Sequence, residues 1–179
     1  MLQKILDDLK TEVKFGYLKK NHPFRYPVLA SIFSNSPVQR TVVLRDSTLN
    51  FDLLMYTDER SNKVKHFVEN SRGSLLFYHP KKLLQIKISG RVVVLRSGPE
   101  YDNHWGGLQG RSIKDFVTNN PPGTPIVNPD RVSYKEDEHH FCLLKLIPDK
   151  MEYLQLKRPN HIRAEFMKFN DWEGSFLTP

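Results

Sequence analysis

The sequence contains very little cysteine and lacks any long apolar run. Its one cysteine, Cys142, excludes an internal disulfide framework and fits a reducing compartment. Since Cys142 lies in an apolar segment, we interpret it as buried and inert. No apolar run approaches the ~20 residues that a membrane-spanning helix needs, and the mean hydropathy is −0.52. The first residues alternate apolar and charged side chains, so we expect no signal peptide and a cytoplasmic protein.

Length and charge narrow the classes further. With 179 residues the chain is long enough for a sizeable core, and we expect a single domain over residues 1–179. The net charge of +7 indicates anionic partners, which could be nucleic acid or phosphorylated small molecules. The sequence has no RNP, helix-turn-helix or zinc-finger signature, and its basic residues are dispersed. The composition therefore argues against nucleic acid as the partner.

Short strand-like runs separated by turn residues dominate the chain. Apolar and β-branched residues mark expected strands at 28–33, 40–45, 51–56, 74–78, 84–90, 92–95, 141–147, 151–156 and 161–166. Residues 148–150 are expected to form a turn. Helical spacing predicts an amphipathic helix over 2–20, a second helix capped by Asp58, and partial helix within 97–120. Because strands do not alternate with helices, the pattern predicts a mainly β (α+β) fold, an antiparallel barrel with peripheral helices.

Phosphate-binding residue types gather around the second and third expected strands. Arg40 and Arg45 bracket an apolar run, and a possible helix start near Ser61 and Lys63 offers a hydroxyl, an ammonium and free backbone N–H groups. Gln85 is an isolated amide that can donate and accept hydrogen bonds at once.

At these residues the sequence resembles the pyridoxamine 5′-phosphate oxidase family, whose fold is a split β-barrel that binds FMN between two subunits. Three segments match the family's flavin elements in order: Arg40 to Arg45, Tyr56-Thr57 with Ser61 and Lys63, and Leu75–Phe77 followed by Gln85 and Gly90. The resemblance extends from about Tyr26 to the end of the chain.

The resemblance implies FMN as cofactor, a homodimer with FMN at the subunit interface, and a small anionic substrate. The implied FMN-binding residues are Arg40, Thr41, Val42, Val43, Leu44, Arg45, Tyr56, Thr57, Ser61, Asn62, Lys63 and Gln85. In a regular strand Arg40 and Arg45 point to opposite faces, so they can serve one ligand only at a strand end or across a bulge. Taken singly, each arginine is also compatible with a solvated position on the barrel surface.

Two departures from the family pattern concern the phosphate and the substrate. Asn62 stands where the oxidase usually has an arginine, and the arginine-leucine-histidine-aspartate-arginine signature is replaced by the segment from His161 to Glu165. His161 and Arg163 share strand parity and are the candidate substrate residues, although both could be ordinary surface residues. Trp105 and Arg111 lie where the family often places substrate-side residues. The catalytic residues and the substrate stay unassigned.

Two remaining sequence patterns give little information about function. Residues 136–140 read Glu-Asp-Glu-His-His, but adjacent histidines on a strand point apart, so we expect a solvated loop and no metal. Residues 106–110 lack the spacing of a dinucleotide loop. The sequence thus predicts an FMN-dependent oxidoreductase that resembles pyridoxamine 5′-phosphate oxidase. The alternative is a flavin- or haem-binding protein with a storage or stress role and no turnover.

Overall fold

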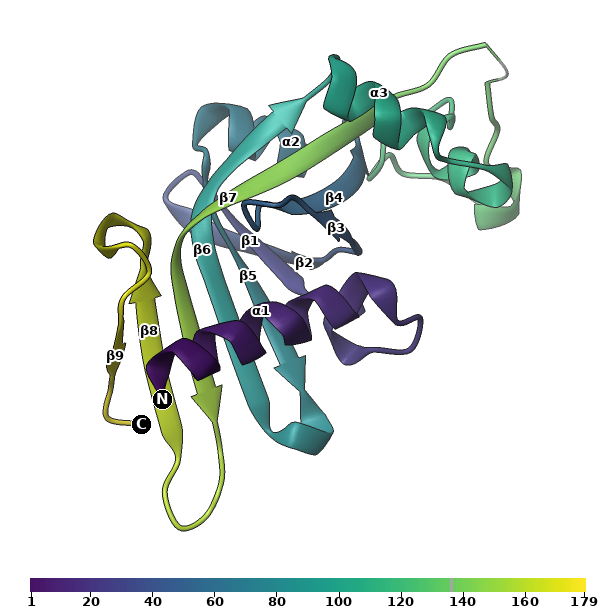
Figure 1. Cartoon of the computed structure of the whole chain (residues 1–179). Coiled ribbons are helices and arrows are strands. Elements are labelled where there is room, and N and C mark those ends of the chain that lie inside the picture. The colour runs from purple at the N-terminus through teal and green to yellow at the C-terminus, as the bar shows by residue number, and fades with distance from the viewer. Residues whose placement is uncertain (136) are drawn as a thin grey trace.

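The computed structural model describes residues 1–135 and 137–179 and consists mainly of antiparallel strands (Figure 1). The helices are α1 (Leu2–Leu18), α2 (Asn62–Glu69) and α3 (Pro99–Gly106). The strands are β1 (Val28–Phe33), β2 (Ser36–Thr41), β3 (Leu44–Ser47), β4 (Leu53–Asp58), β5 (Arg72–His79), β6 (Leu84–Leu95), β7 (Phe141–Gln155), β8 (Ile162–Met167) and β9 (Gly174–Phe176). Short 3₁₀ turns η1 to η5 cover Pro23–Arg25, Pro80–Lys82, Gly110–Phe116, Pro129–Arg131 and Lys168–Asn170. None of the described helices is both long and apolar enough to cross a membrane.

The chain connects the two ends of the sheet directly, which closes it toward a barrel. The strands follow the order β2-β1-β5-β6-β7-β4-β3, with β8 beside β7 and β9 beside β8. β2 and β3 stand at opposite ends of this order, yet only Val42 and Val43 separate them in sequence. Thr41 and Leu44 are three residues apart, which spans at most ~11 Å, so the two sheet ends must lie close together. The antiparallel barrel expected from the sequence is confirmed.

The expected single strand over residues 40–45 is wrong. β2 ends at Thr41, β3 begins at Leu44, and the pairing of β3 with β4 shifts between Leu44 and Asp46. Arg45 is therefore the extra residue of a β-bulge, which changes the direction of its side chain relative to a regular strand. The break occurs because the chain leaves one sheet end and joins the other within these residues.

The expected turn at residues 148–150 is also wrong, because one continuous strand, β7, runs from Phe141 to Gln155. Its first half pairs with β4 and its second half with β8, and the register against β6 shifts where Gly90 faces Pro148. A Cβ atom on Gly90 would lie 2.0 Å from the carbonyl oxygen of Ile147. Glycine thus permits the close approach of β6 and β7 at the bend, and the proline is accommodated in a bulge instead of ending the strand.

The structure also differs from the sequence-based prediction at the start of α2. Ser61, and not Asp58, precedes its first residue, while the Asp58 carboxylate accepts hydrogen bonds from the backbone and the guanidinium of Arg60. Arg60 also donates to the carbonyl oxygen of Thr118 at 2.8 Å, so it links this corner to the loop after η3.

Helix α1 covers the main core. Figure 1 shows it crossing the lower half of the strands, with its N-terminal end beside β8. Its buried positions Ile5, Leu6, Leu9 and Val13 recur at helical spacing and join the buried strand residues in one cluster. A second cluster under α3 contains Leu54, Tyr101, Phe116, Phe141 and Leu143. Cys142 is fully buried, and burial raises the pKa of its thiol to about 12, which agrees with an inert cysteine.

Candidate functional site

Two cations converge near the point where the sheet ends meet. Arg40 lies near the end of β2, and Lys63 lies in the first turn of α2. Arg40 Nη2 lies 3.4 Å from His66 Nδ1, and Lys63 precedes His66 by one turn of α2, so the two cations are neighbours. Burial lowers the pKa of Lys63, and the positive charge of Arg40 lowers it further. Among the described residues, neither side chain forms a salt bridge with a carboxylate, although Asp58 lies close enough to oppose the lowering.

Hydroxyl groups surround the ammonium group of Lys63. Its Nζ donates to Thr57 Oγ1 at 2.8 Å, and Thr57 Oγ1 lies 3.3 Å from Ser61 Oγ. Ser61 precedes α2 without capping it by a side-chain hydrogen bond. The backbone N–H of Val64 donates to the carbonyl oxygen of Ser61 at 3.0 Å, whereas those of Asn62 and Lys63 have no hydrogen bond among the described residues and are available to a ligand. The combined donors form an anion-binding corner made of Arg40, Thr57, Ser61 and Lys63.

A second group of predicted residues surrounds Tyr56, which neighbours Thr57 on β4 but points to the other face. The guanidinium carbon of Arg45 lies 5.1 Å from the centre of the Tyr56 ring, and the Tyr56 hydroxyl lies 2.8 Å from His104 Nδ1. Burial raises the pKa of Tyr56, and the charge of Arg45 opposes that rise. The Arg45 Nε atom is buried and has no hydrogen-bond partner among the described residues.

The remaining predicted flavin residues link or flank these groups. Thr41 ends β2, Val42 and Val43 connect the sheet ends, and Leu44 is fully buried at the start of β3. Asn62, the first residue of α2, is exposed.

Gln85 lies apart from the anion-binding corner. Across the sheet, Arg40 on β2 is paired with Leu29 on β1, which is paired with Leu75 on β5 and then with Ile88 on β6. Ile88 is three residues from Gln85 on the same strand. With ~4.8 Å between strands and ~3.4 Å between residues, Arg40 and Gln85 are roughly 17 Å apart along the sheet. Because Ile88 and Gln85 differ in parity, Gln85 points to the outer face, whereas Arg40 points to the inner face.

The two predicted substrate residues lie near Gln85. Gln85 is paired to Leu154 and Leu154 to Arg163, so Gln85 and Arg163 share the outer face two strands apart. The Arg163 guanidinium lies 3.8 Å from the Glu152 carboxylate. His161 is exposed in the loop before β8, and its Nδ1 accepts a hydrogen bond from the backbone of Lys157.

Comparisons with known proteins identify the family. The sequence profile described as "Pyridoxamine 5'-phosphate oxidase, FMN-binding domain" matches residues 4–96. The chain is 30% identical over 165 residues to a pyridoxine/pyridoxamine 5'-phosphate oxidase 2 of Arabidopsis thaliana, which covers 82% of each chain. The chain therefore belongs to the pyridoxamine 5′-phosphate oxidase family of FMN-binding domains, and FMN is its cofactor.

Solved structures agree on the fold. A pyridoxamine 5'-phosphate oxidase-related, FMN-binding protein of Nostoc punctiforme superimposes with a TM-score of 0.80 at 22% identity, over 94% of this chain and 95% of the other. PhzG of Burkholderia lata, solved with tetrahydrophenazine-1-carboxylic acid, gives a TM-score of 0.73 at 19% identity, over 99% and 90% of the two chains. The fold is the split barrel of these FMN-binding proteins.

The anion-binding corner fits the phosphate of FMN in its chemistry. A phosphate dianion needs fixed cations and hydroxyl or backbone donors. Arg40 and Lys63 supply two cations that no carboxylate neutralises by a salt bridge within the described residues, and Thr57 and Ser61 supply hydroxyls. An unbalanced pair of partly buried cations is costly in a protein without an anionic ligand.

The sequence-based prediction did not include several polar residues around the site. Ser31 and His66 contact Arg40, and His104 contacts Tyr56. These residues come from β1, α2 and α3, and no local motif joins them to the arginine or the tyrosine in sequence. Of residues 136–140, which were expected to form a solvated loop, Glu136 lies outside the described residues, Asp137 and Glu138 are exposed, and His140 is buried, contrary to the expectation. The His139 ring stacks on Trp105 with 3.9 Å between centroids, and Arg111 is exposed.

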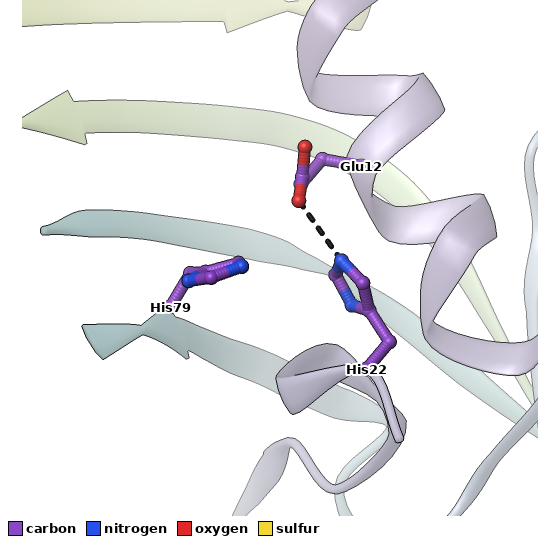
Figure 2. Close-up of side chains that lie close together, drawn as sticks. All are labelled: Glu12, His22 and His79. Atoms are coloured by element: carbon purple, nitrogen blue, oxygen red, sulfur yellow. Dashed lines mark hydrogen bonds and ion pairs between the residues drawn. The ribbon is translucent and has the colours of Figure 1, made fainter. Parts of the chain in front are cut away.

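A separate polar cluster ties α1 to two turns. Figure 2 shows Glu12 on α1 facing His22 and His79, whose ligand-type atoms all lie within 4.8 Å of one another. Each histidine precedes a proline and caps a 3₁₀ turn. His22 Nδ1 accepts from the backbone of Phe24 at 3.2 Å, and His79 Nδ1 accepts from that of Lys82 at 3.4 Å.

This capping decides what the cluster can bind. A neutral imidazole that accepts at Nδ1 carries its proton on Nε2, and His22 Nε2 donates to Glu12 at 2.9 Å. Lys82 Nζ contacts both Glu12 carboxylate oxygens, at 2.6 and 2.8 Å. A metal ion would need the nitrogen lone pairs that these protons occupy. We therefore interpret the cluster as a hydrogen-bonded ion pair that fastens α1 to η1 and η2.

Proposed function

We propose that the protein is an FMN-dependent oxidoreductase whose anion-binding corner holds the FMN phosphate. The observation that carries the proposal is the convergence of Arg40 and Lys63 beside two hydroxyl groups, without a salt-bridged carboxylate in the described part of the chain. Arg40 binds the phosphate with its guanidinium fork, and Lys63 acts as a point charge. The proposal takes residues 1–179 as one domain, and the single buried cysteine supports a cytoplasmic location.

The other residues of the matched segments bind the rest of the cofactor. FMN supplies two-electron chemistry by accepting a hydride from the substrate. Arg45, whose buried Nε lacks a partner among the described residues, lies on the ring or ribityl side together with Tyr56. A cation there stabilises negative charge that develops on the ring. Gln85 offers an amide to the pyrimidine edge. No residue is assigned as a catalytic acid or base.

The geometry favours a homodimer with each site built from two subunits. Arg40 and Gln85 point to opposite faces of one sheet roughly 17 Å apart, so a single subunit cannot place both on one cofactor. The outer face around Gln85 also exposes apolar side chains: Ile32 is 38%, Leu76 38% and Tyr78 52% exposed. In the proposed dimer this face covers the FMN whose phosphate lies in the partner's anion-binding corner, and it contributes Gln85 to the pyrimidine edge of that flavin.

Mixed dimers test the shared site. Arg40→Ala and Gln85→Ala each weaken both sites of a homodimer. A dimer that combines one subunit of each variant contains one site with both residues intact and one with neither. Co-expression with two affinity tags should therefore recover half the wild-type FMN content in the mixed dimer, with the mass measured by light scattering. A monomeric mass, or a mixed dimer without recovered FMN, would reject the shared site.

The substrate is proposed to be a small anionic molecule. The name of the Arabidopsis relative makes pyridoxine and pyridoxamine 5′-phosphates the first compounds to test, and the compound bound to PhzG makes a carboxylated ring the second. Arg163, on the outer face with Gln85, offers a guanidinium to such an anion once it leaves Glu152. His161 adds an imidazole at the edge of the same face.

Spectra of the purified protein test the function in two steps. A yellow protein, or one that takes up FMN on titration, is expected, whereas a haem spectrum or a protein that stays colourless with excess FMN refutes the cofactor site. Anaerobic bleaching by one of the test compounds or by NAD(P)H then shows reduction of the flavin, and return of the colour when oxygen is admitted completes the turnover. Bound FMN that no compound reduces would favour the alternative, a flavin-binding protein without turnover. The exposed Asn62 and the Arg163–Glu152 contact favour that alternative.

A further inference from the structure

Three neutral hydrogen-bond acceptors contact the guanidinium of Arg40 on its buried side. Its Nη1 donates to Ser31 Oγ at 2.8 Å and to the carbonyl oxygen of Leu29 at 3.2 Å, and its Nη2 lies 3.4 Å from His66 Nδ1. Ser31 is 2% and His66 6% exposed, so both acceptors are buried while Arg40 is only partly buried. These contacts occupy one side of the guanidinium fork and leave other N–H groups free to donate.

The imidazole of His66 can play this part only in its neutral form. The serine hydroxyl accepts a hydrogen bond from Arg40 and donates one to His66 Nδ1 at 3.0 Å, and the longer 3.4 Å contact from Arg40 Nη2 shares the same nitrogen lone pair. The Phe33 ring stacks on His66 with 4.6 Å between centroids and 17° between planes. Burial lowers the pKa of His66, and the charge of Arg40 lowers it further, which keeps the imidazole neutral at neutral pH. The contact of Nδ1 with the Arg40 guanidinium then places the single ring proton on Nε2.

The neutrality of these acceptors matters for an anion site. A carboxylate behind Arg40 would orient the guanidinium equally well, but it would also cancel the charge that the phosphate needs. A hydroxyl, a carbonyl and a neutral imidazole fix the orientation and preserve the full positive charge. A preorganised cation loses less side-chain entropy when the ligand arrives.

We infer that Ser31 and His66 are positioning residues, which orient Arg40 toward the phosphate of FMN. The inference rests on the proposed function, in which Arg40 binds that phosphate. Because both residues are buried beneath the arginine, each would act through Arg40 and not by direct contact with the cofactor. Their loss should weaken the binding of flavins that carry a phosphate and leave the binding of flavins without a phosphate unchanged.

Comparison of FMN with riboflavin separates this role from a general structural one. His66→Phe keeps an aromatic ring against Phe33 and removes the acceptor, and His66→Asn keeps an acceptor near the position of Nδ1. Dissociation constants for both flavins are measured by quenching of flavin fluorescence. His66→Phe and Ser31→Ala should each weaken FMN about tenfold, as expected for one lost hydrogen bond to a charged group. Riboflavin affinity should stay within about twofold, and His66→Asn should restore most of the FMN affinity.

A double-variant cycle supplies the second readout. If His66 acts through Arg40, then adding His66→Phe to Arg40→Ala causes no further loss of FMN. Equal weakening of FMN and riboflavin, an additive double variant, or unchanged FMN affinity in both His66→Phe and Ser31→Ala would each overturn the inference. Thermal melting of the variants checks folding. Failure of the wild-type protein to bind either flavin would instead refute the proposed function.

Discussion

Replacement of Lys63 by methionine should stabilise the protein without FMN and weaken its complex with FMN. The ammonium group is partly buried beside Arg40, and both burial and that neighbouring charge lower its pKa. Its hydrogen bond to Thr57 at 2.8 Å offsets part of this cost. Methionine has a similar length and no charge, and replacement of a buried charge by a well-packed apolar group stabilises by about 1 kcal/mol or more. In a domain of this size that corresponds to a rise in Tm of roughly 2–4 °C.

The same replacement removes a charge-assisted hydrogen bond to the phosphate. Such a bond contributes about 1.5–3 kcal/mol, so the dissociation constant for FMN should rise roughly 10- to 100-fold. Thermal unfolding with and without FMN, combined with a fluorescence titration, measures both effects. Lys65→Met is the matched control, because Lys65 is exposed on the same helix and should change neither quantity. A lower Tm for FMN-free Lys63→Met with unchanged FMN affinity would show that Lys63 is a structural residue and would refute the reasoning.

Two further predictions concern the scaffold. Glu12→Gln should destabilise the protein by about 2 kcal/mol in urea unfolding, because it breaks the ion pair with the half-exposed Lys82. Although burial alone would raise the pKa of Glu12, hydrogen bonds from its partners lower it overall. The contribution of Glu12 to the free energy of unfolding should therefore be complete above about pH 5, the upper range of the pKa of an unfolded glutamate. It should decline as the pH falls through the lower pKa of the folded state. A difference in stability between wild type and variant that does not change with pH would contradict this. Gly90→Ala should destabilise the protein by about 3 kcal/mol, since its Cβ would lie 2.0 Å from the carbonyl oxygen of Ile147. Gly106→Ala is the control and should be neutral or stabilising, because a Cβ there would have nothing within 4 Å. Similar unfolding midpoints for the two alanine variants would exclude the close approach at Gly90.

The success of sequence-based prediction depended on how local each determinant was. Helix α1 and strand β1 were predicted nearly residue for residue, because their apolar spacing is continuous and their boundaries carry turn residues. The turn predicted at 148–150 was wrong because Pro148 lies opposite Gly90, and the space that this glycine provides is a property of the neighbouring strand. The strand predicted over 40–45 was wrong for a similar reason, since the change of sheet end at Val42 is visible only once all strands are placed.

The site shows the same division. Matched spacing pointed to Arg40, Thr57, Ser61 and Lys63, and the structure brings these four residues to one corner. Whether they and the other matched residues bind FMN stays a prediction. No sequence pattern pointed to Ser31 and His66, because their relation to Arg40 arises from the pairing of β1 with β2 and from the packing of α2 on β1. Gln85 was expected at the same cofactor as Arg40. Only the strand registers reveal that the two side chains point to opposite faces of the sheet within one chain.

Charge balance distinguishes the two polar clusters of the molecule. Around Glu12, one carboxylate meets the ammonium of Lys82 and the imidazole of His22, so the charges compensate within the chain and the cluster is complete without a ligand. Around Arg40 and Lys63, the hydrogen-bond acceptors among the described residues are all neutral, and Asp58 is near but forms its salt bridge with Arg60. Folding alone gives no reason to keep such a pair partly buried, because a carboxylate or an apolar residue would be less costly there. A dianionic ligand that supplies the missing charge removes the cost, and this is the physical reason to place the FMN phosphate at that corner.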